Sequence, residues 1–310
     1  VQPAGIPGRT VFGHPIGLAN LFGVELWERF SYYGMVLILG YYLYYSLDQG
    51  GLALPQATAT GIVGAYGGTV YLSTVLGGWL ADRVLGMERM VFYGGVVVML
   101  GHLALAVLPG LSGVAVGLVL VALGSGALKA NASSLLGTLY PKGDPRADGG
   151  FTLFYLGINL GGFIGPLVTG LLQDSIGFHV GFGAAALGMA LGLAQYAVFR
   201  RNLGTAGRHA PNPLPASARP KAIGIGVAIV VVIAAVALTG LVTLAALPRV
   251  ISVVLVLASI AYFATMLMSP KVTSEERTKL RAYIPLFIAN VAFWSLFQQI
   301  FTVLAVYSDE

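Results

Sequence analysis

The sequence predicts an all-α polytopic membrane protein with about nine spans. Of its 310 residues, 57% are hydrophobic and only 9% are charged, whereas a soluble domain has about 25% charged residues. The mean hydropathy is +0.84, and the hydrophobic residues gather in long runs. Most of these runs exceed the roughly 20 residues that a helix needs to cross a bilayer.

The predicted spans are separated by short polar turns, apart from one longer polar segment after residue 200. They cover residues 18–46, 57–82, 89–108, 112–137, 149–173, 178–200, 222–243, 249–268 and 281–307. We divide the chain into an N-terminal six-helix bundle (1–200), a cytoplasmic linker (201–221), an inserted transmembrane helical hairpin (222–268) and the start of a second bundle with a seventh helix (269–310). Pro211, Pro213 and Pro215 interrupt helix formation in the linker.

The first span contains three full charges, Glu25, Glu28 and Arg29. Each charge near the centre of a membrane helix costs about 2.5–3.5 kcal/mol on insertion scales. Residues 25, 28, 29, 32 and 36 share one helix face, which must therefore point into the protein or a watery cavity. One guanidinium cannot neutralise both carboxylates, so this face suits a proton relay. A purely structural ion pair is the alternative.

The fourth span contains Lys129 among small and apolar residues. An ammonium at this depth needs a partner, and Glu25 and Glu28 are the only carboxylates at comparable depth in the first six spans. We therefore predict a cluster of Glu25, Glu28, Arg29 and Lys129. The alternative is that Lys129 extends to the membrane interface.

Other polar residues and glycines occur within the spans. Gly157, Gly161 and Gly165 stand four apart, which predicts close helix packing. Asn159 lies between them and is expected to reach another helix or a ligand. His102 is expected to be a buried, neutral and hydrogen-bonded side chain. Tyr66, Trp294 and Gln298 have polar groups within spans, although each taken singly favours packing over ligand contact.

The positive charges predict the orientation. If the N-terminus is cytoplasmic, all but three of the 17 Lys and Arg residues lie on the cytoplasmic side. Of those three, Arg249 is on the opposite side, and Arg29 and Lys129 are inside spans. This bias follows the positive-inside rule, and it accounts for the net charge of +5 without a nucleic-acid partner. We expect a plasma (inner) membrane location.

The sequence contains no chemistry typical of an enzyme. It has no cysteine, which excludes disulfides and thiolate metal sites, and it has no metal-ligand spacing or Ser/His/Asp set. We expect no cofactor or metal, and protons as the ion that the charged face of the first span binds.

Two motifs together resemble the proton-coupled oligopeptide transporters of the major facilitator superfamily. They are Glu25-x-x-Glu28-Arg29-Phe30 followed by Tyr32-Tyr33-Gly34, and Phe154-Tyr155-x-x-Ile158-Asn159-x-Gly161. The resemblance implies proton-coupled uptake of di- and tripeptides by alternating access. It assigns proton coupling to Glu25, Glu28, Arg29 and Lys129. It assigns substrate binding to Tyr32, Tyr33, Tyr66, Asn159, Trp294 and Gln298.

Three departures from the family pattern leave alternatives open. Val36 stands where many members have arginine or another polar residue, and Gln298 stands where some have glutamate. The third is that the sequence ends after the predicted seventh helix of the family fold, so we expect most of the family's C-terminal half to be missing from it. The same fold carrying nitrate, an amino acid or a drug-like anion is therefore one alternative. A truncated, non-transporting membrane scaffold is another.

Overall fold

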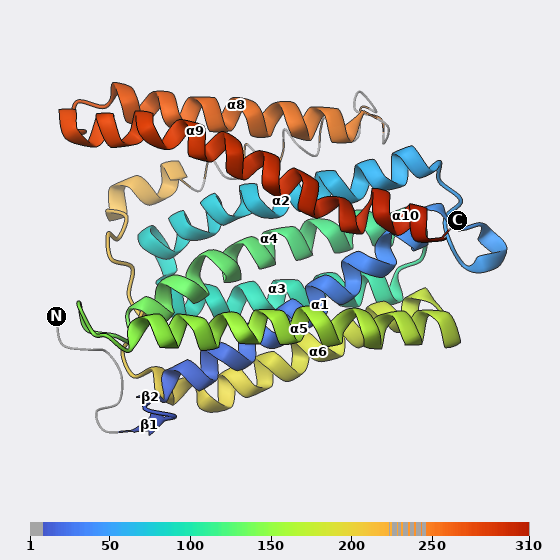
Figure 1. Ribbon diagram of the computed structural model, residues 1–310, viewed down its shortest axis with the longest axis horizontal. Coiled ribbons are helices and arrows are strands. Elements are labelled where there is room, and N and C mark those ends of the chain that lie inside the picture. The colour runs from blue at the N-terminus through green and yellow to red at the C-terminus, as the bar shows by residue number, and fades with distance from the viewer. Residues whose placement is uncertain are drawn as a thin grey trace.

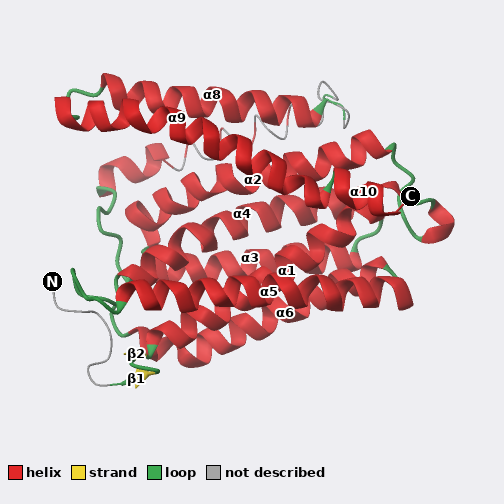
Figure 2. Ribbon diagram, viewed as in Figure 1, coloured by secondary structure: helices red, strands yellow, loops and turns green. Residues whose placement is uncertain are grey.

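The computed structural model describes residues 9–222, 224, 228, 231, 235, 239, 243 and 246–309 as a set of long helices preceded by a small β-hairpin (Figures 1 and 2). The hairpin pairs β1 (Thr10–Val11) with β2 (His14–Pro15). The long helices are α1 (Gly17–Tyr44), α2 (Gln56–Leu80), α3 (Met87–Val107), α4 (Gly110–Gly137), α5 (Ala147–Ser175), α6 (Phe178–Phe199), α8 (Leu247–Met268) and α9 (Ser274–Phe297). Short helical turns are Leu47–Gln49, Ala81–Leu85, Arg200–Leu203, Ala216–Ala218 and Gln298–Phe301, and the described chain closes with α10 (Val303–Asp309).

This architecture confirms the predicted all-α class. The first six predicted spans and the span at 249–268 each have a matching helix, while the span at 222–243 falls largely outside the described residues. Among the described residues, six helical segments are long and apolar enough to cross a membrane: α3, α4, α5, α6 with its following turn, α8, and the stretch from Ser274 to Ser308. The protein is therefore a multi-pass membrane protein, and α1 and α2 pack within the same bundle.

The last predicted span needs a correction. Its helix begins at Ser274, seven residues earlier than expected, and changes to a tighter turn at Gln298. A reciprocal cap explains the early start. Thr273 N donates to Glu276 Oε2 at 2.9 Å, and Glu276 N donates to Thr273 Oγ1 at 3.3 Å. Such a capping box starts a helix regardless of hydropathy, so α9 begins before its apolar stretch.

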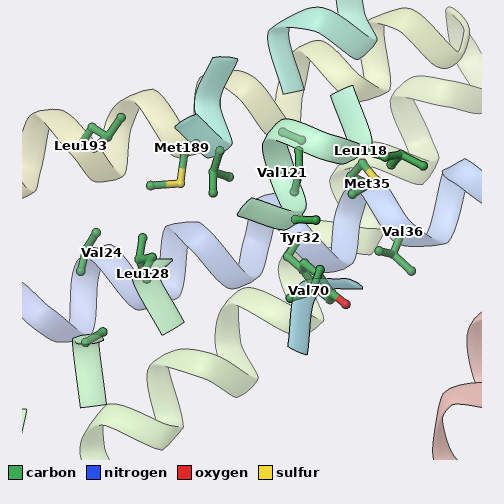
Figure 3. Packing of buried hydrophobic residues seen from close by; sticks show 14 of the residues in the cluster. Val24, Tyr32, Met35, Val36, Val70, Leu118, Val121, Leu128, Met189 and Leu193 are labelled. Carbon is green, nitrogen blue, oxygen red and sulfur yellow. The ribbon is translucent and has the colours of Figure 1, made fainter. Parts of the chain in front are cut away.

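Helix α1 packs on both α5 and α6, which also contact each other; α3 packs on α4 and α6, and α2 packs on α4 (Figure 1). Glycines allow the α1–α5 contact. A Cβ atom on Gly161 would lie 2.1 Å from Leu26 O, and one on Gly165 would lie 2.2 Å from Phe30 O. The predicted close packing of this glycine stripe is confirmed. Leu128 of α4, Met189 of α6, and Val24 and Met35 of α1 are fully buried members of one hydrophobic core (Figure 3).

Several polar contacts link segments that meet at one end of the bundle, the end at which Figure 1 shows the N-terminal hairpin. Arg146 Nη1 donates to Gly13 O at 3.1 Å, and Arg200 Nη2 donates to Glu88 Oε2 at 2.7 Å. The linker joins this end because Asn212 N donates to Asp82 O at 3.0 Å. Loops that carry many of the basic residues are thus gathered on one side.

Helices α8 and α9 lie at the edge of the bundle, and neither contains a buried residue. Helix α8 runs along α2, where Pro248 fills the space above Gly61 and Leu255 fills the space above Gly68. After α9, the Phe301 ring stacks on Tyr33 with centroids 5.7 Å apart. Tyr41 Oη also donates to Ala305 O at 3.4 Å, so the described chain returns to α1 near its end.

Candidate functional site

The charged face of α1 is enclosed by protein. Glu25, Glu28 and Arg29 are 3%, 0% and 3% exposed. Arg29 Nε donates to Glu28 Oε2 at 2.5 Å and lies 3.3 Å from Glu25 Oε1. Residues 25 and 29 are one helical turn apart, so the i, i+4 spacing that suggested a shared face also forms an ion pair.

A neighbouring helix completes the surroundings of Glu28. Ser125 of α4 is fully buried, and its Oγ donates to Glu28 Oε1 at 2.7 Å. Both oxygens of Glu28 therefore accept hydrogen bonds. Glu25 Oε2 is also buried but has no hydrogen-bond partner among the described residues. Ser125 was not predictable as part of the site, because a single serine between Gly124 and Gly126 has no spacing that marks a partner on another helix.

Lys129 lies one turn beyond Ser125 on α4, but the ion pair that we expected with a glutamate is not formed. Its Nζ lies 3.3 Å from Tyr71 Oη and 4.4 Å from the centre of the Tyr71 ring. Ser125 already donates to Glu28 Oε1. Lys129, one turn further along α4, instead contacts Tyr71 of α2. Lys129 remains close enough to Glu25 and Glu28 for their charges to interact.

Tyrosines from two helices surround the guanidinium. The Arg29 Cζ atom lies 4.9 Å from the Tyr32 ring centre and 5.7 Å from that of Tyr33. Tyr32 stacks on Tyr66 of α2 with centroids 6.0 Å apart. Tyr66 Oη is buried without a hydrogen-bond partner among the described residues. The structure thus brings together three of the predicted substrate-binding residues beside the charges.

The other three predicted substrate-binding residues differ in position. Gln298 approaches α2 beside Tyr66, since its Nε2 lies 3.7 Å from where a Cβ on Gly67 would be. Asn159 does not reach another helix and donates to Tyr155 O of its own helix at 2.9 Å. Trp294 is 41% exposed and packs on Phe297 with centroids 5.4 Å apart.

Two further expectations concern groups that bind protons or metals. His102 is fully buried as expected, but neither ring nitrogen has a hydrogen-bond partner within the described part of the chain. Within that same part, no group of three or more His, Asp or Glu side chains could hold a metal ion.

Two carboxylates and one guanidinium form a buried group that can exchange protons. Arg29 balances one negative charge, so the second carboxylate is either an unbalanced buried anion or protonated. Burial of ionisable side chains in a membrane helix is costly and marks functional sites. The tyrosines next to them offer hydroxyl groups and aromatic faces to a ligand.

Comparisons with known proteins identify the family to which the chain is similar. A family model described as "POT family" matches residues 88–310. The di-/tripeptide transporter of Lactococcus lactis subsp. cremoris is 45% identical over 313 residues, which cover 97% of this chain and 62% of the relative. The chain thus spans about 55–62% of the length of the curated relatives that it matches over most of its own length.

Solved structures agree in fold. A crystal structure of a peptide transporter POT in complex with sulfate matches with a TM-score of 0.92 and 46% identity, covering 99% of this chain and 64% of the other. A POT family transporter in complex with 5-aminolevulinic acid matches with a TM-score of 0.93 and 42% identity, covering 98% and 64% of the two chains.

Proposed function

The chain belongs to the POT family, and from this premise we propose that the protein takes up di- and tripeptides together with protons by alternating access. One observation carries the proposal. Glu25, Glu28 and Arg29 are buried on the face of α1 that also holds Tyr32 and Tyr33. Groups that bind a proton and groups that bind an organic ligand thus share one helix face, so either can affect the other.

The proton-coupling set that we propose is Glu25, Glu28, Arg29 and Lys129. Arg29 contacts both carboxylates, so protonating either one frees the guanidinium to bind the other carboxylate or a substrate. Lys129 contributes a second positive charge that interacts with both glutamates. Proton binding would therefore redistribute ion pairs between α1 and α4, which are helices of the same bundle.

The substrate-binding set that we propose is Tyr32, Tyr33, Tyr66, Asn159, Trp294 and Gln298. A short peptide has an amino group and a carboxylate, and the cluster offers charges of both signs beside aromatic rings. The relative from Lactococcus lactis is named as a di-/tripeptide transporter, which supports this substrate class. Asn159 and Trp294 are exposed on their own helices, so we propose that their side chains are accessible to the substrate.

A second substrate class has specific support. A structural neighbour with 42% identity was solved in complex with 5-aminolevulinic acid, an amino acid without a peptide bond. Val36 and Gln298 are less polar or less acidic than the family pattern, which is compatible with an amino acid, nitrate or drug-like anion as substrate. A non-transporting scaffold would predict neither binding nor sensitivity to changes at Glu28.

We further propose a plasma-membrane location with the N-terminus in the cytoplasm. The loops gathered beside the N-terminal hairpin contain Arg9, Arg83, Arg146 and Arg200, as the positive-inside rule requires of a cytoplasmic side. On this proposal, 1–200 is the N-terminal bundle, 201–221 a cytoplasmic linker, 222–268 an inserted hairpin and 269–310 the start of a second bundle. Because the sequence contains no cysteine, a single cysteine can replace Lys142 or Ser112. A membrane-impermeant thiol reagent is then added outside right-side-out vesicles. Labelling of position 142 from outside would contradict the orientation.

The central test is uptake of a labelled dipeptide into proteoliposomes under an inward proton gradient. We expect accumulation that a protonophore abolishes. Glu28→Gln should remove gradient-driven uptake but preserve counterflow exchange. Glu275→Gln is the matched control, because Glu275 forms an exposed pair with Lys279 at 2.7 Å. Gradient-driven uptake that survives in Glu28→Gln would refute the coupling assignment.

Competition experiments separate the substrate classes. Unlabelled dialanine, 5-aminolevulinic acid and nitrate are each added in excess to the same uptake assay. Inhibition by dialanine supports the peptide proposal. Inhibition only by 5-aminolevulinic acid or nitrate would replace it with the corresponding alternative, and absence of any specific uptake would favour the scaffold.

A further inference from the structure

Ser125 is a buried hydroxyl that no feature of the sequence singled out. Its Oγ lies 2.7 Å from Glu28 Oε1, and both side chains are fully buried. We propose that Ser125 is a positioning residue that holds the Glu28 carboxylate in register with α4. Only the expected effect of Ser125 on transport rests on the proposed function.

The direction of the Ser125 hydrogen bond is unusual for a serine in a helix. Serine hydroxyls inside helices commonly donate to the carbonyl one turn earlier. Ser134 of the same helix does so, with its Oγ 3.0 Å from Ala130 O. Ser125 instead points across the helix interface to a carboxylate on α1. Ser125 Oγ therefore forms a contact between helices.

The hydrogen bonds of the two glutamates differ. Glu28 accepts from Ser125 on Oε1 and from Arg29 on Oε2, so both oxygens are occupied by donors. Glu25 has Arg29 near Oε1 only, and its Oε2 has no partner in the described structure. Donors to both oxygens favour the charged carboxylate over the acid. Ser125 thereby makes the two carboxylates unequal, although both are on one helix face.

The position of Ser125 also links this pair to Lys129. Residues 125 and 129 are one turn apart on α4 and lie on the same side. Any displacement of α4 relative to α1 that separates Ser125 from Glu28 must also change the distance from Lys129 to the glutamates. Ser125 therefore couples the surroundings of Glu28 to the packing of two helices.

Several other groups act on the same carboxylate and must be considered in any pH experiment. They are Glu25, Arg29, Tyr32 and Tyr33 on α1, Tyr66 on α2 and Lys129 on α4. Ser125 variants leave all of these residues unchanged in sequence, so a change in pH profile is attributed to the lost hydroxyl.

The first test measures gradient-driven dipeptide uptake in proteoliposomes as a function of pH. A hydrogen bond to a charged group shifts an ionisation midpoint by roughly one to two pH units. We expect Ser125→Ala to move the midpoint upward by about this amount. Ser125→Cys keeps the size but donates weakly, so it should give a smaller shift. Ser134→Ala is the matched control and should give none. An unchanged midpoint in Ser125→Ala would refute the proposal.

The second test does not depend on transport. The melting temperature of the detergent-solubilised protein is measured between pH 5 and 8 for Ser125→Ala, Glu28→Gln and the double variant. We expect Ser125→Ala to change the pH dependence of the melting temperature, and to have little further effect when Glu28 is already replaced. Equal losses in both backgrounds would mean that Ser125 only fills space, which would refute the inference.

The two tests distinguish failure of the inference from failure of the proposed function. Non-additive melting temperatures without any peptide uptake would leave Ser125 as the partner of Glu28 and remove the transport proposal. Peptide uptake with additive melting temperatures and an unshifted midpoint would do the reverse. If Ser125→Ala does not fold, Ser125→Cys carries the same comparison at nearly unchanged volume.

Discussion

The bundle α1–α6 and the pair α8–α9 differ in the burial of their side chains and in the partners of their charged groups. In α1, even the charged side chains are buried, and each has partners on its own helix or on α4. In α8 and α9 no residue is buried, and the ionic contact of α9 is an exposed pair on its own surface. Both regions belong to one multi-pass membrane protein, yet among the described helices the side chains of α1 are enclosed and those of α8 and α9 are not. A polar group acquires a defined environment only where neighbouring helices enclose it, because lipid offers no hydrogen bonds.

The largest contrast is expected between two arginines. Arg29→Leu leaves two buried carboxylates without their cation, and breaking such a group costs about 3–5 kcal/mol. Arg277→Leu in α9 removes one hydrogen bond, from Nη2 to Ser269 O at 2.9 Å, and should cost less than about 1 kcal/mol. Thermal unfolding in detergent measures both. Similar losses would contradict the difference between the regions.

A purely apolar comparison comes next. Leu128 is 0% exposed between α1 and α4, so Leu128→Ala should create a cavity and cost about 2–5 kcal/mol. Leu255 is only partly covered where α8 meets α2, and Leu255→Ala should cost less than about half as much because lipid fills the gap. The midpoint of chemical denaturation in detergent provides the measurement, and a greater loss at Leu255 would reverse the assignment of the core.

Two glycines of α5 sharpen the comparison within one helix. At Gly161 a Cβ would lie 2.1 Å from Leu26 O, whereas at Gly170 it would have nothing within 4 Å. Gly161→Ala should therefore separate α5 from α1 and cost about 1–3 kcal/mol. Gly170→Ala should be neutral or stabilising by up to about 1 kcal/mol. Melting temperatures of the two variants test this, and equal effects would mean that the close contact is absent.

The smallest effect is expected at Tyr71, which lies at the boundary of the charged site. Tyr71→Phe removes the hydroxyl 3.3 Å from Lys129 Nζ but keeps the ring 4.4 Å away. We expect a change in gradient-driven uptake of less than about threefold. Tyr71→Leu also removes the cation–π contact, worth about 0.5–2 kcal/mol, and should lower uptake further. If both variants behave alike, the ring does not hold Lys129.

The spacing of residues within one helix made part of the site predictable. Glu25, Glu28, Arg29 and Tyr32 share a face by helical periodicity alone, and the structure brings them together. The partner of Lys129 was not predictable in the same way. It depended on the rotation of α4 and on which neighbour each turn of α4 faced. Asn159 illustrates the same limit, because its amide found an acceptor in its own helix.

By itself, the sequence determined the membrane class, the first six helices and the charged face of α1. These depend on hydropathy, run length and helical period, which are properties of adjacent residues. Only the tertiary structure decided that Ser125 rather than Lys129 contacts Glu28, that Tyr66 stacks on Tyr32, and that Gln298 reaches α2. These contacts join helices far apart in the chain, and a shift of one residue in packing register would direct different side chains at the same carboxylates.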